Sequence, residues 1–257
     1  MNKEIILSKE FLNRESVLRE VINFLDKNKS FREDYTKKYC YNLLDEHKSS
    51  KENIMTVFIN TINAAGGNNL TLTGRACKNF FNIIDKLPES KTVSFESFLS
   101  LFNAKNIIEL FNSLSNNKES LPNFGKKKTA LFIRDLDVLN KKLFSDYLID
   151  KNDLIIPVDI VIEIMLNKIL LLNEKKLSAS RDFDLINDFF KGKLKDKFML
   201  IEDLWFWGYF NLVKQDKSRK ILFNEDKFYS DLFLYPSTTL KDKLQEFEKL
   251  MNKLGIK

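Results

Sequence analysis

The sequence contains one histidine, His47, and two cysteines, Cys40 and Cys77. His47 lies in the charged stretch LLDEHKSS, most simply an exposed helix end, and this position argues against a nucleophile triad that needs an imidazole base. One histidine is too few for a metal site built mainly from histidine. Two cysteines are too few for a four-cysteine zinc site or an iron–sulfur cluster, and their scarcity is typical of a reducing cytoplasm. We therefore expect no metal site, and any catalysis must rest on carboxylates, lysines, tyrosines or hydroxyls.

Long uncharged apolar runs are also absent. The most apolar stretch, residues 155–173, contains Asp159, Glu163 and Lys168, and these charges argue against a membrane span. The beginning of the sequence, MNKEIILSKEF, is charged almost at once, which argues against a signal peptide. We expect a soluble, cytoplasmic protein that has no membrane partner.

Apolar residues, by contrast, make up 44% of the 257 residues, and 23 residues are phenylalanine. This composition can fill a substantial core, so a disordered tail is excluded. The formal net charge is +6, although 36 acidic residues are scattered along the chain. A nucleic-acid partner fits this charge, but a solvated surface fits it as well, so charge alone does not decide the partner.

Strand alternation is scarce, whereas helical spacing of apolar residues recurs along the whole chain. Within residues 8–28, for example, Phe11, Val17, Val21 and Leu25 fall near a helical period. The prolines lie between such patterns, where helices tolerate them. They are Pro88, Pro122, Pro157 and Pro236. The spacing predicts an all-α protein of roughly ten or more helices.

Residues 121–132, LPNFGKKKTALF, place a proline, a glycine and three consecutive lysines at the start of an apolar helical pattern. Asn123 and Gly125 are of the types that tolerate a left-handed backbone. A tight turn here would direct backbone N–H groups and a helix start at one point, which can bind phosphate without base preference. An ordinary turn with solvated lysines explains the same residues, and local chemistry alone favours that interpretation.

The stretch resembles the hairpin of the helix-hairpin-helix DNA glycosylase superfamily, whose hairpins read roughly L-P-G-h-G-x-K, where h is apolar. The matching residues are Leu121, Pro122, Phe124, Gly125 and Lys127. Asn123 stands where glycine is usual. A second family element, an apolar run ending in P-V-D at a helix start, corresponds to IIPVD at residues 155–159.

The resemblance implies that Lys127 is the nucleophile and Asp159 the essential carboxylate. Their separation exceeds that of endonuclease III and is similar to that of the archaeal 8-oxoguanine DNA glycosylase/AP lyase branch, whereas the histidine that usually follows the aspartate is missing. Asp159 is also explained as a helix N-cap, a role that is compatible with catalysis, and the hairpin lysine favours the functional interpretation. The spacing from the glycine selects Lys127, because Lys126 and Lys128 lie about 100° away around a helix.

The same resemblance implies two packed helical subdomains with an active-site cleft between them. Residues 1–257 would form one domain, with an N-terminal helical part to about 105, a hairpin and catalytic part over about 106–215, and C-terminal helices over 216–257. DNA phosphates would be held by Asn123, Phe124, Gly125, Lys126 and Lys128. No cofactor is implied apart from a monovalent cation that could bridge the hairpin and a phosphate.

A base within a duplex must be flipped into a pocket before its glycosidic bond can be reached. Residues 201–210, IEDLWFWGYF, contain both tryptophans of the chain. Asp203 and Trp207 lie four residues apart and resemble an aspartate–tryptophan pair in the base pocket of the archaeal branch. Trp205 and Phe206 are further candidates for the pocket wall, and core packing explains the whole cluster as well.

These residues lead us to expect a monomeric DNA glycosylase with AP lyase activity that excises an oxidised purine, such as 8-oxoguanine, from double-stranded DNA. One alternative is the excision of hypermodified phage bases in antiviral defence. An alternative of another class is a non-catalytic DNA-binding protein that retains the hairpin, for which Asn123 and the missing histidine argue. A helical protein-interaction module is the third.

Overall fold

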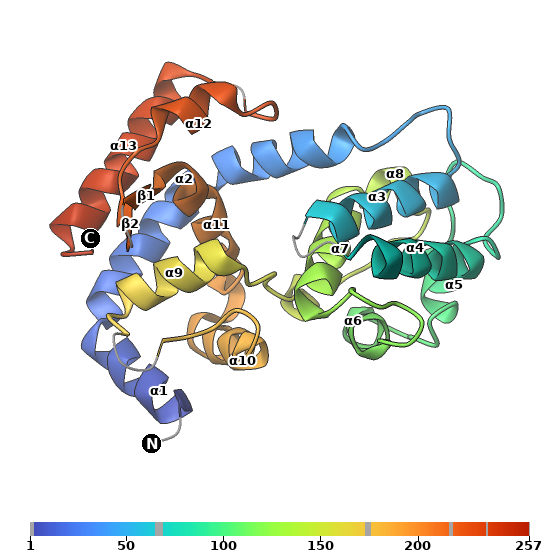
Figure 1. The fold of residues 1–257 in the computed structure, drawn as a ribbon, viewed down its shortest axis with the longest axis horizontal. Coiled ribbons are helices and arrows are strands. Elements are labelled where there is room, and N and C mark those ends of the chain that lie inside the picture. Colours follow the sequence, from blue (N-terminus) through green and yellow to red (C-terminus); the bar gives the residue numbers. More distant parts are fainter. Residues whose placement is uncertain (1–2, 65–68, 173–175, 216–217, 235, 257) are drawn as a thin grey trace. The chain divides into compact units, whose positions relative to one another are not determined.

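The computed structural model describes residues 3–64, 69–172, 176–215, 218–234 and 236–256. Within these ranges it contains 13 α-helices and one two-stranded antiparallel sheet (Figure 1). The expected all-α class is confirmed, and the small sheet is the element that the spacing analysis missed. No helix in the described ranges is long and apolar enough to cross a membrane.

The chain divides into two compact units, which are described separately here. Unit 1 comprises Met1–Tyr35 and Val158–Lys257, and unit 2 comprises Thr36–Pro157. The helix α2 (Glu15–Tyr41) contains the first boundary. The expectation of one domain in three consecutive parts stays a prediction, since this division does not test whether the units fold independently.

Unit 1 takes its elements from both ends of the chain. Besides most of α2 it contains α1 (Lys3–Asn13), α9 (Ile160–Ile169), α10 (Phe183–Leu194), α11 (Leu200–Asn211), β1 (Leu212–Gln215), β2 (Ser218–Ile221), α12 (Glu225–Ser230) and α13 (Thr238–Lys253), with a short 3-10 helix at Lys195–Lys197. Unit 2 is one continuous segment. It contains α3 (Ser50–Ala64), α4 (Leu70–Ile84), α5 (Phe95–Ser100), α6 (Ile107–Asn116), α7 (Lys126–Val138) and α8 (Asn140–Leu143), with a 3-10 helix at Lys151–Asp153.

Many helices begin where the sequence offers a capping side chain. Asn, Ser or Asp at the N-cap accepts a hydrogen bond from a backbone N–H two or three residues further on, which satisfies an otherwise unpaired donor of the first turn. These caps are Asn69, Ser94, Asn106, Asp159, Asn224 and Ser237. The helix α7 is an exception, because its N-cap residue is Gly125.

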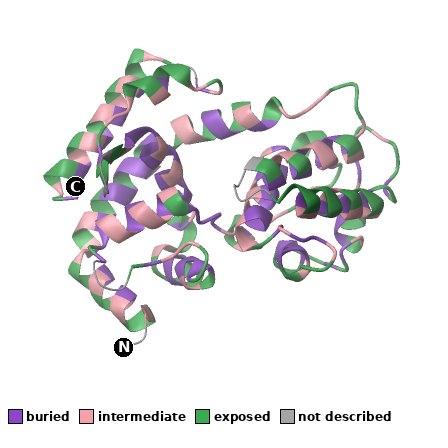
Figure 2. Cartoon of the chain, in the orientation of Figure 1, coloured by how far each residue is buried: buried purple, intermediate pink, exposed green. Residues whose placement is uncertain are grey.

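Figure 2 shows which positions of the chain are buried. In the core of unit 2, phenylalanine is prominent among the buried residues. The rings of Phe58 in α3 and Phe80 in α4 are stacked with their centroids 3.8 Å apart. Phe132 of α7 meets both rings edge to face, and Phe124 lies 4.6 Å from Phe58 between centroids. Since Phe124 precedes α7 directly, this core fixes the point at which that helix starts.

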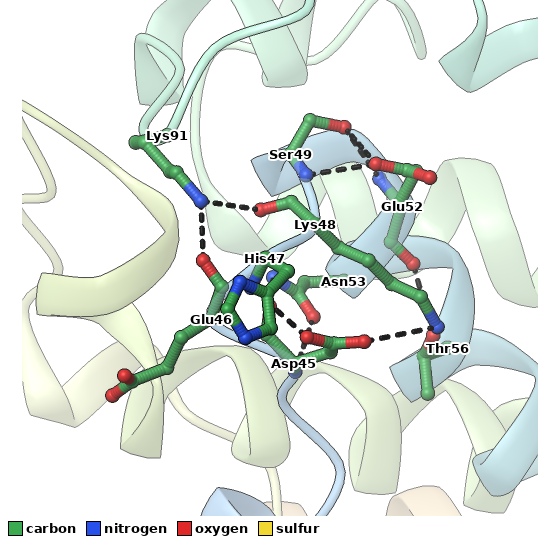
Figure 3. Close-up of polar contacts among 9 residues, drawn as sticks. All are labelled: Asp45, Glu46, His47, Lys48, Ser49, Glu52, Asn53, Thr56 and Lys91. Atoms are coloured by element: carbon green, nitrogen blue, oxygen red, sulfur yellow. Dashed lines mark hydrogen bonds and ion pairs between the residues drawn. The ribbon is translucent and has the colours of Figure 1, made fainter.

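The connection between α2 and α3 is held by polar contacts that fix the start of α3 (Figure 3). Asp45 and Asn53 exchange backbone and side-chain hydrogen bonds of 3.0 and 3.1 Å. The backbone N–H and the hydroxyl of Ser49 both donate to the Glu52 carboxylate at 2.8 Å. His47 is exposed, as expected, but it lies in the connection between α2 and α3 and not at a helix end.

In unit 1, α9 packs closely against α11 at Gly208. A Cβ atom on Gly208 would lie 2.6 Å from Val161 Cγ1 and 3.0 Å from Met165 Cγ, so only glycine allows this approach. Since Val161 and Met165 belong to α9, Gly208 helps to determine where the first turn of that helix lies.

Candidate functional site

The segment between α6 and α7 forms a tight turn. The backbone N–H of Phe124 donates to the carbonyl of Leu121 at 3.2 Å. Asn123 adopts a left-handed conformation with φ of 65°, whereas Gly125 has an extended backbone with φ of −89°. The side-chain amide of Asn123 donates to Thr73 Oγ1 at 3.2 Å, which ties the turn to α4. Asparagine therefore adopts the backbone conformation that the turn requires at this position.

The start of α7 has no side-chain cap bond, and the same is true of α8, α10 and α11. Gly125 cannot supply one, and the first α-helical bond runs from Thr129 N–H to the Gly125 carbonyl at 3.0 Å. Among the described residues, the backbone N–H groups of Gly125, Lys127 and Lys128 donate no hydrogen bond to a backbone carbonyl, and no side chain caps the helix. These donors and the positive end of the helix dipole form a site suited to an anion.

The three lysines of the first turn have different surroundings. Lys126 and Lys127 are partly exposed, whereas Lys128 is only 7% exposed. The ammonium of Lys128 donates to the carbonyl of Ile62, in the last turn of α3, at 2.9 Å. Burial, together with the charge of Lys127, lowers the pKa of Lys128. Because the ammonium of Lys128 already holds α3, its expected contact with a DNA phosphate stays a prediction.

Three cations in the first turn are unfavourable for the helix itself. The helix dipole disfavours positive charge at this end, and α7 has no acidic residue in its first turn. Each exposed cation costs on the order of 0.3 to 1 kcal/mol in such a position. A bound anion would offset this cost for the exposed lysines.

Asp159 lies at the N-cap of α9 in unit 1. Its Oδ1 accepts hydrogen bonds from the backbone N–H groups of Val161 and Ile162, each at 2.9 Å, and the residue is 9% exposed. The capping interpretation of Asp159 is therefore confirmed. Lys127 belongs to unit 2 and Asp159 to unit 1. Their surroundings are therefore described separately, each within its own unit.

Asp203 is completely buried in α11 and forms an ion pair with Arg32 of α2, whose Nε donates to Oδ1 at 2.8 Å. Its other oxygen, Oδ2, has no hydrogen-bond partner in the described part of the protein. Burial raises the pKa of Asp203 to about 7, because the nearby guanidinium offsets only part of the cost of removing a carboxylate from water.

Trp207 is also completely buried. Its indole meets the rings of Phe24, Phe206 and Phe247 at centroid distances of 4.9, 5.3 and 5.6 Å. Phe206 is buried as well, while Trp205 is half-buried. These contacts place Trp207 and Phe206 in the core of unit 1, and their role as walls of a base pocket stays a prediction.

Unpaired polar atoms gather on one face of α11. Four buried side-chain polar atoms lack a partner within the described ranges, and three of them are Asp203 Oδ2, Trp207 Nε1 and Asn211 Oδ1. Their spacing of four residues places them on one helical face. Leaving such groups unpaired costs about 1 to 3 kcal/mol each. Asn211 continues the spacing of Asp203 and Trp207 and could have been found from it, whereas no local pattern pointed to Arg32.

The described residues contain no cluster of three His, Cys, Asp or Glu side chains that could hold a metal ion. The monovalent cation expected at the hairpin stays a prediction. No protein-family model matches the chain, and no similar protein was found among curated proteins or solved structures. The resemblance to glycosylases therefore rests on the sequence around Lys127, Asp159 and Trp207.

Proposed function

We propose that this protein is a DNA glycosylase with AP lyase activity, in which Lys127 is the nucleophile and Asp159 the assisting carboxylate. The observation that supports it most is the start of α7. Its N-cap carries no side chain, its first turn has three lysines and no acid, and Lys127 is partly exposed there. A helix start of this kind suits a phosphate backbone, and Lys127 would lie beside the bound sugar.

The proposed reaction begins with the neutral amine of Lys127, which attacks C1′ of the deoxyribose. The bond between C1′ and the base breaks, and its electron pair leaves with the base, which takes up a proton. The lysine nitrogen, now positively charged, gives one proton to the Asp159 carboxylate. The C1′–O4′ bond then breaks, O4′ takes up a proton, and a protonated Schiff base forms between C1′ and the lysine nitrogen. Loss of a C2′ proton and cleavage of the C3′–O bond then break the strand by β-elimination.

Asp159 would have two tasks in this reaction. Its carboxylate would accept a proton from the lysine, and it would stabilise the positive charge that develops on the sugar. Oδ1 is already held by two backbone N–H groups, which fixes the orientation of the carboxylate. The proposal requires Lys127 from unit 2 and Asp159 from unit 1 to meet at one deoxyribose, in the cleft that the resemblance implies.

The substrate that we propose is double-stranded DNA with an oxidised purine such as 8-oxoguanine, bound by a monomer in the cytoplasm. Asp203 and Trp207 would contact the flipped base, with Trp205 and Phe206 nearby. The unpaired Oδ2 and Nε1 atoms support this, because they offer an acceptor and a donor without a partner in the described protein. A hypermodified phage base is the alternative substrate, which would give the protein a role in antiviral defence.

A non-catalytic DNA-binding protein is the second candidate. The hydrogen bonds of Asp159 to the first turn of α9 favour it, because this structural role explains the aspartate without any chemistry. Such a protein would bind phosphates at the α7 start and would form no covalent intermediate.

Borohydride trapping separates these candidates. The protein is incubated with duplex DNA containing 8-oxoguanine, and the sample is then reduced to convert a Schiff base into a stable bond. The wild-type protein should yield a covalent complex, and Lys127→Arg should yield none while it retains DNA affinity. Lys126→Ala is the matched control, since it removes a neighbouring charge and should leave trapping intact.

Other outcomes would redirect or overturn the proposal. If trapping were lost in Lys126→Ala and retained in Lys127→Arg, Lys126 would be the nucleophile. If no base were released from oxidised, deaminated, alkylated or hypermodified DNA, the non-catalytic candidate would stand. Lys128→Ala is unsuitable as a control, because it leaves the Ile62 carbonyl without its partner.

A further inference from the structure

The β1–β2 hairpin of unit 1 carries several positive charges. Its strands pair antiparallel, so that Lys214 lies directly opposite Arg219, and Val213 opposite Lys220. These three cations are exposed, while the pair Leu212 and Ile221 at the base of the hairpin is buried. The hairpin is thus anchored at its base and positively charged beyond it.

The base of the hairpin is held by the neighbouring helices. The backbone N–H of Leu222, which follows β2, donates to the carbonyl of Asn211 at the end of α11 at 2.8 Å. Next to it, the N–H of Phe223 donates to the Glu248 carboxylate of α13 at 2.9 Å. The hairpin therefore has a defined position on α11 and α13 of unit 1.

The direct pairing of Lys214 with Arg219 is unfavourable for folding. Like charges directly opposite each other destabilise a sheet, and two strands of four residues have little stability to lose. No carboxylate of the described residues forms an ion pair with Lys214, Arg219 or Lys220. Some other lysines of unit 1 do form ion pairs, as Lys243 does with Glu246.

A fourth cation lies close to this group. The ammonium of Lys227 in α12 donates to the carbonyl of Tyr209 at 3.0 Å and lies 4.6 Å from the centroid of the Tyr209 ring. Burial and the charge of Arg219 lower the pKa of Lys227, so Arg219 lies near enough to act on it. Positive charge thus accumulates on two adjoining elements of unit 1.

We propose that the β1–β2 hairpin is a DNA-binding element in which Lys214, Arg219 and Lys220 contact the phosphates of a duplex. Its exposed cations complement the charge of the backbone, and phosphates would relieve the repulsion between Lys214 and Arg219. Such contacts add affinity without base preference. The assignment of DNA as the polyanion rests on the proposed function, which places DNA at the α7 start of unit 2.

The salt dependence of DNA binding tests this proposal. The dissociation constant of an undamaged duplex is measured over a range of salt concentrations for wild type and for the triple variant Lys214→Gln, Arg219→Gln, Lys220→Gln. Each lost phosphate contact lowers the slope of log K against log salt by about 0.9, so the triple variant should lose roughly 2 to 3.

Two controls make the result specific. The triple variant Lys9→Gln, Lys27→Gln, Lys253→Gln removes the same charge from exposed positions of unit 1 and should leave the slope nearly unchanged. A charge-retaining variant, with Lys214→Arg and Lys220→Arg, should bind as wild type does. Thermal unfolding of each variant reports whether the hairpin change has damaged the fold.

The proposal is overturned if both triple variants lower the slope equally, or if the hairpin variant keeps the wild-type slope. Hairpin-dependent binding of duplex RNA but not of duplex DNA would overturn it as well. Borohydride trapping of wild-type protein at saturating concentration distinguishes a failure of the hairpin proposal from a failure of the proposed glycosylase function. If the hairpin variant has the wild-type slope and the wild-type protein is trapped, the DNA-binding role of the hairpin is refuted and the glycosylase proposal stands. If the hairpin variant has a reduced slope and the wild-type protein is not trapped, only the glycosylase proposal is refuted.

Discussion

The helices α7 and α9 carry the two proposed catalytic residues, and their first turns are built in opposite ways. The first turn of α7 has a glycine N-cap without a side-chain cap bond, three lysines and no acidic residue. The first turn of α9 is capped by its own carboxylate, since Asp159 accepts two backbone N–H groups at 2.9 Å.

This difference shows which residue points to a function more directly. Asp159 would be retained for folding alone, because an N-cap contributes about 0.5 to 2 kcal/mol. Lys128 of α7 also has a structural role, since it donates to the Ile62 carbonyl. For Lys127 no such role is evident, and a cation at a helix start is destabilising. The start of α7 is therefore the stronger indication of a partner, and the contribution of Asp159 must be separated from its capping role by experiment.

Replacing Asp159 is the test of this comparison for which we expect the largest effect, a loss of base excision. Asp159→Asn keeps a capping side chain and removes the charge, so the fold should be retained while base excision falls by about 100-fold to 10,000-fold. Asp159→Ala should lose the same activity and, in addition, about 0.5 to 2 kcal/mol of unfolding free energy. Single-turnover excision and urea unfolding measure the two effects, and normal activity in Asp159→Asn would reduce the aspartate to a cap.

The buried charges of the two units extend the comparison. Burial lowers the pKa of Lys128 in unit 2 and raises that of Asp203 in unit 1, so both groups shift toward their neutral forms. The folded state holds the proton of Asp203 up to about pH 7, whereas the unfolded chain releases it near the ordinary value of 3.8. The stability that Asp203 contributes is therefore full below pH 4 and is lost as the pH rises through 7.

This linkage can be measured by unfolding wild type and Asp203→Asn in urea between pH 4 and pH 8. The difference in unfolding free energy between the two proteins should decline by on the order of 4 kcal/mol over this interval, at 1.36 kcal/mol per pKa unit. Asparagine does not titrate, so the variant supplies the reference. Parallel curves would show that Asp203 stays ionised and that Arg32 compensates fully for its burial.

The position of the α9 start depends on Gly208, and an added methyl group should displace it. Gly208→Ala should cost about 1 to 3 kcal/mol of unfolding free energy, because its Cβ would clash with Val161 and Met165. The matched control is Gly192→Ala in α10, where the Cβ meets open space. That variant should gain up to about 1 kcal/mol, and equal effects of both variants in thermal unfolding would refute the close packing.

The smallest predicted effect concerns the charge at the α7 start. Lys127→Gln should raise the unfolding free energy by about 0.3 to 1 kcal/mol, because it removes a cation from the wrong end of a helix. Lys253→Gln, in the last turn of α13, should lower it by a similar amount. Urea unfolding at low salt would show these opposite signs. A destabilised Lys127→Gln would instead reveal a structural role for this lysine.

The sequence determined the helical class and the turn before α7. Apolar spacing predicts helices wherever a helix buries one face, and Asn123 adopts the left-handed backbone that its residue type tolerates. The capping of α9 by Asp159 followed from its place after Pro157 and Val158. These features are local, so a few neighbouring residues are enough to specify them.

Other features were decided by tertiary structure. Unit 1 joins α1 and most of α2 to the C-terminal part of the chain. Arg32 forms an ion pair with Asp203, and Lys128 donates to the Ile62 carbonyl. Each of these contacts joins residues far apart in sequence. Local spacing carries no information on such partners. The sequence therefore indicated which residues are chemically suited to a site, and the packing of distant segments decided which of them are exposed, which are buried and which are already paired.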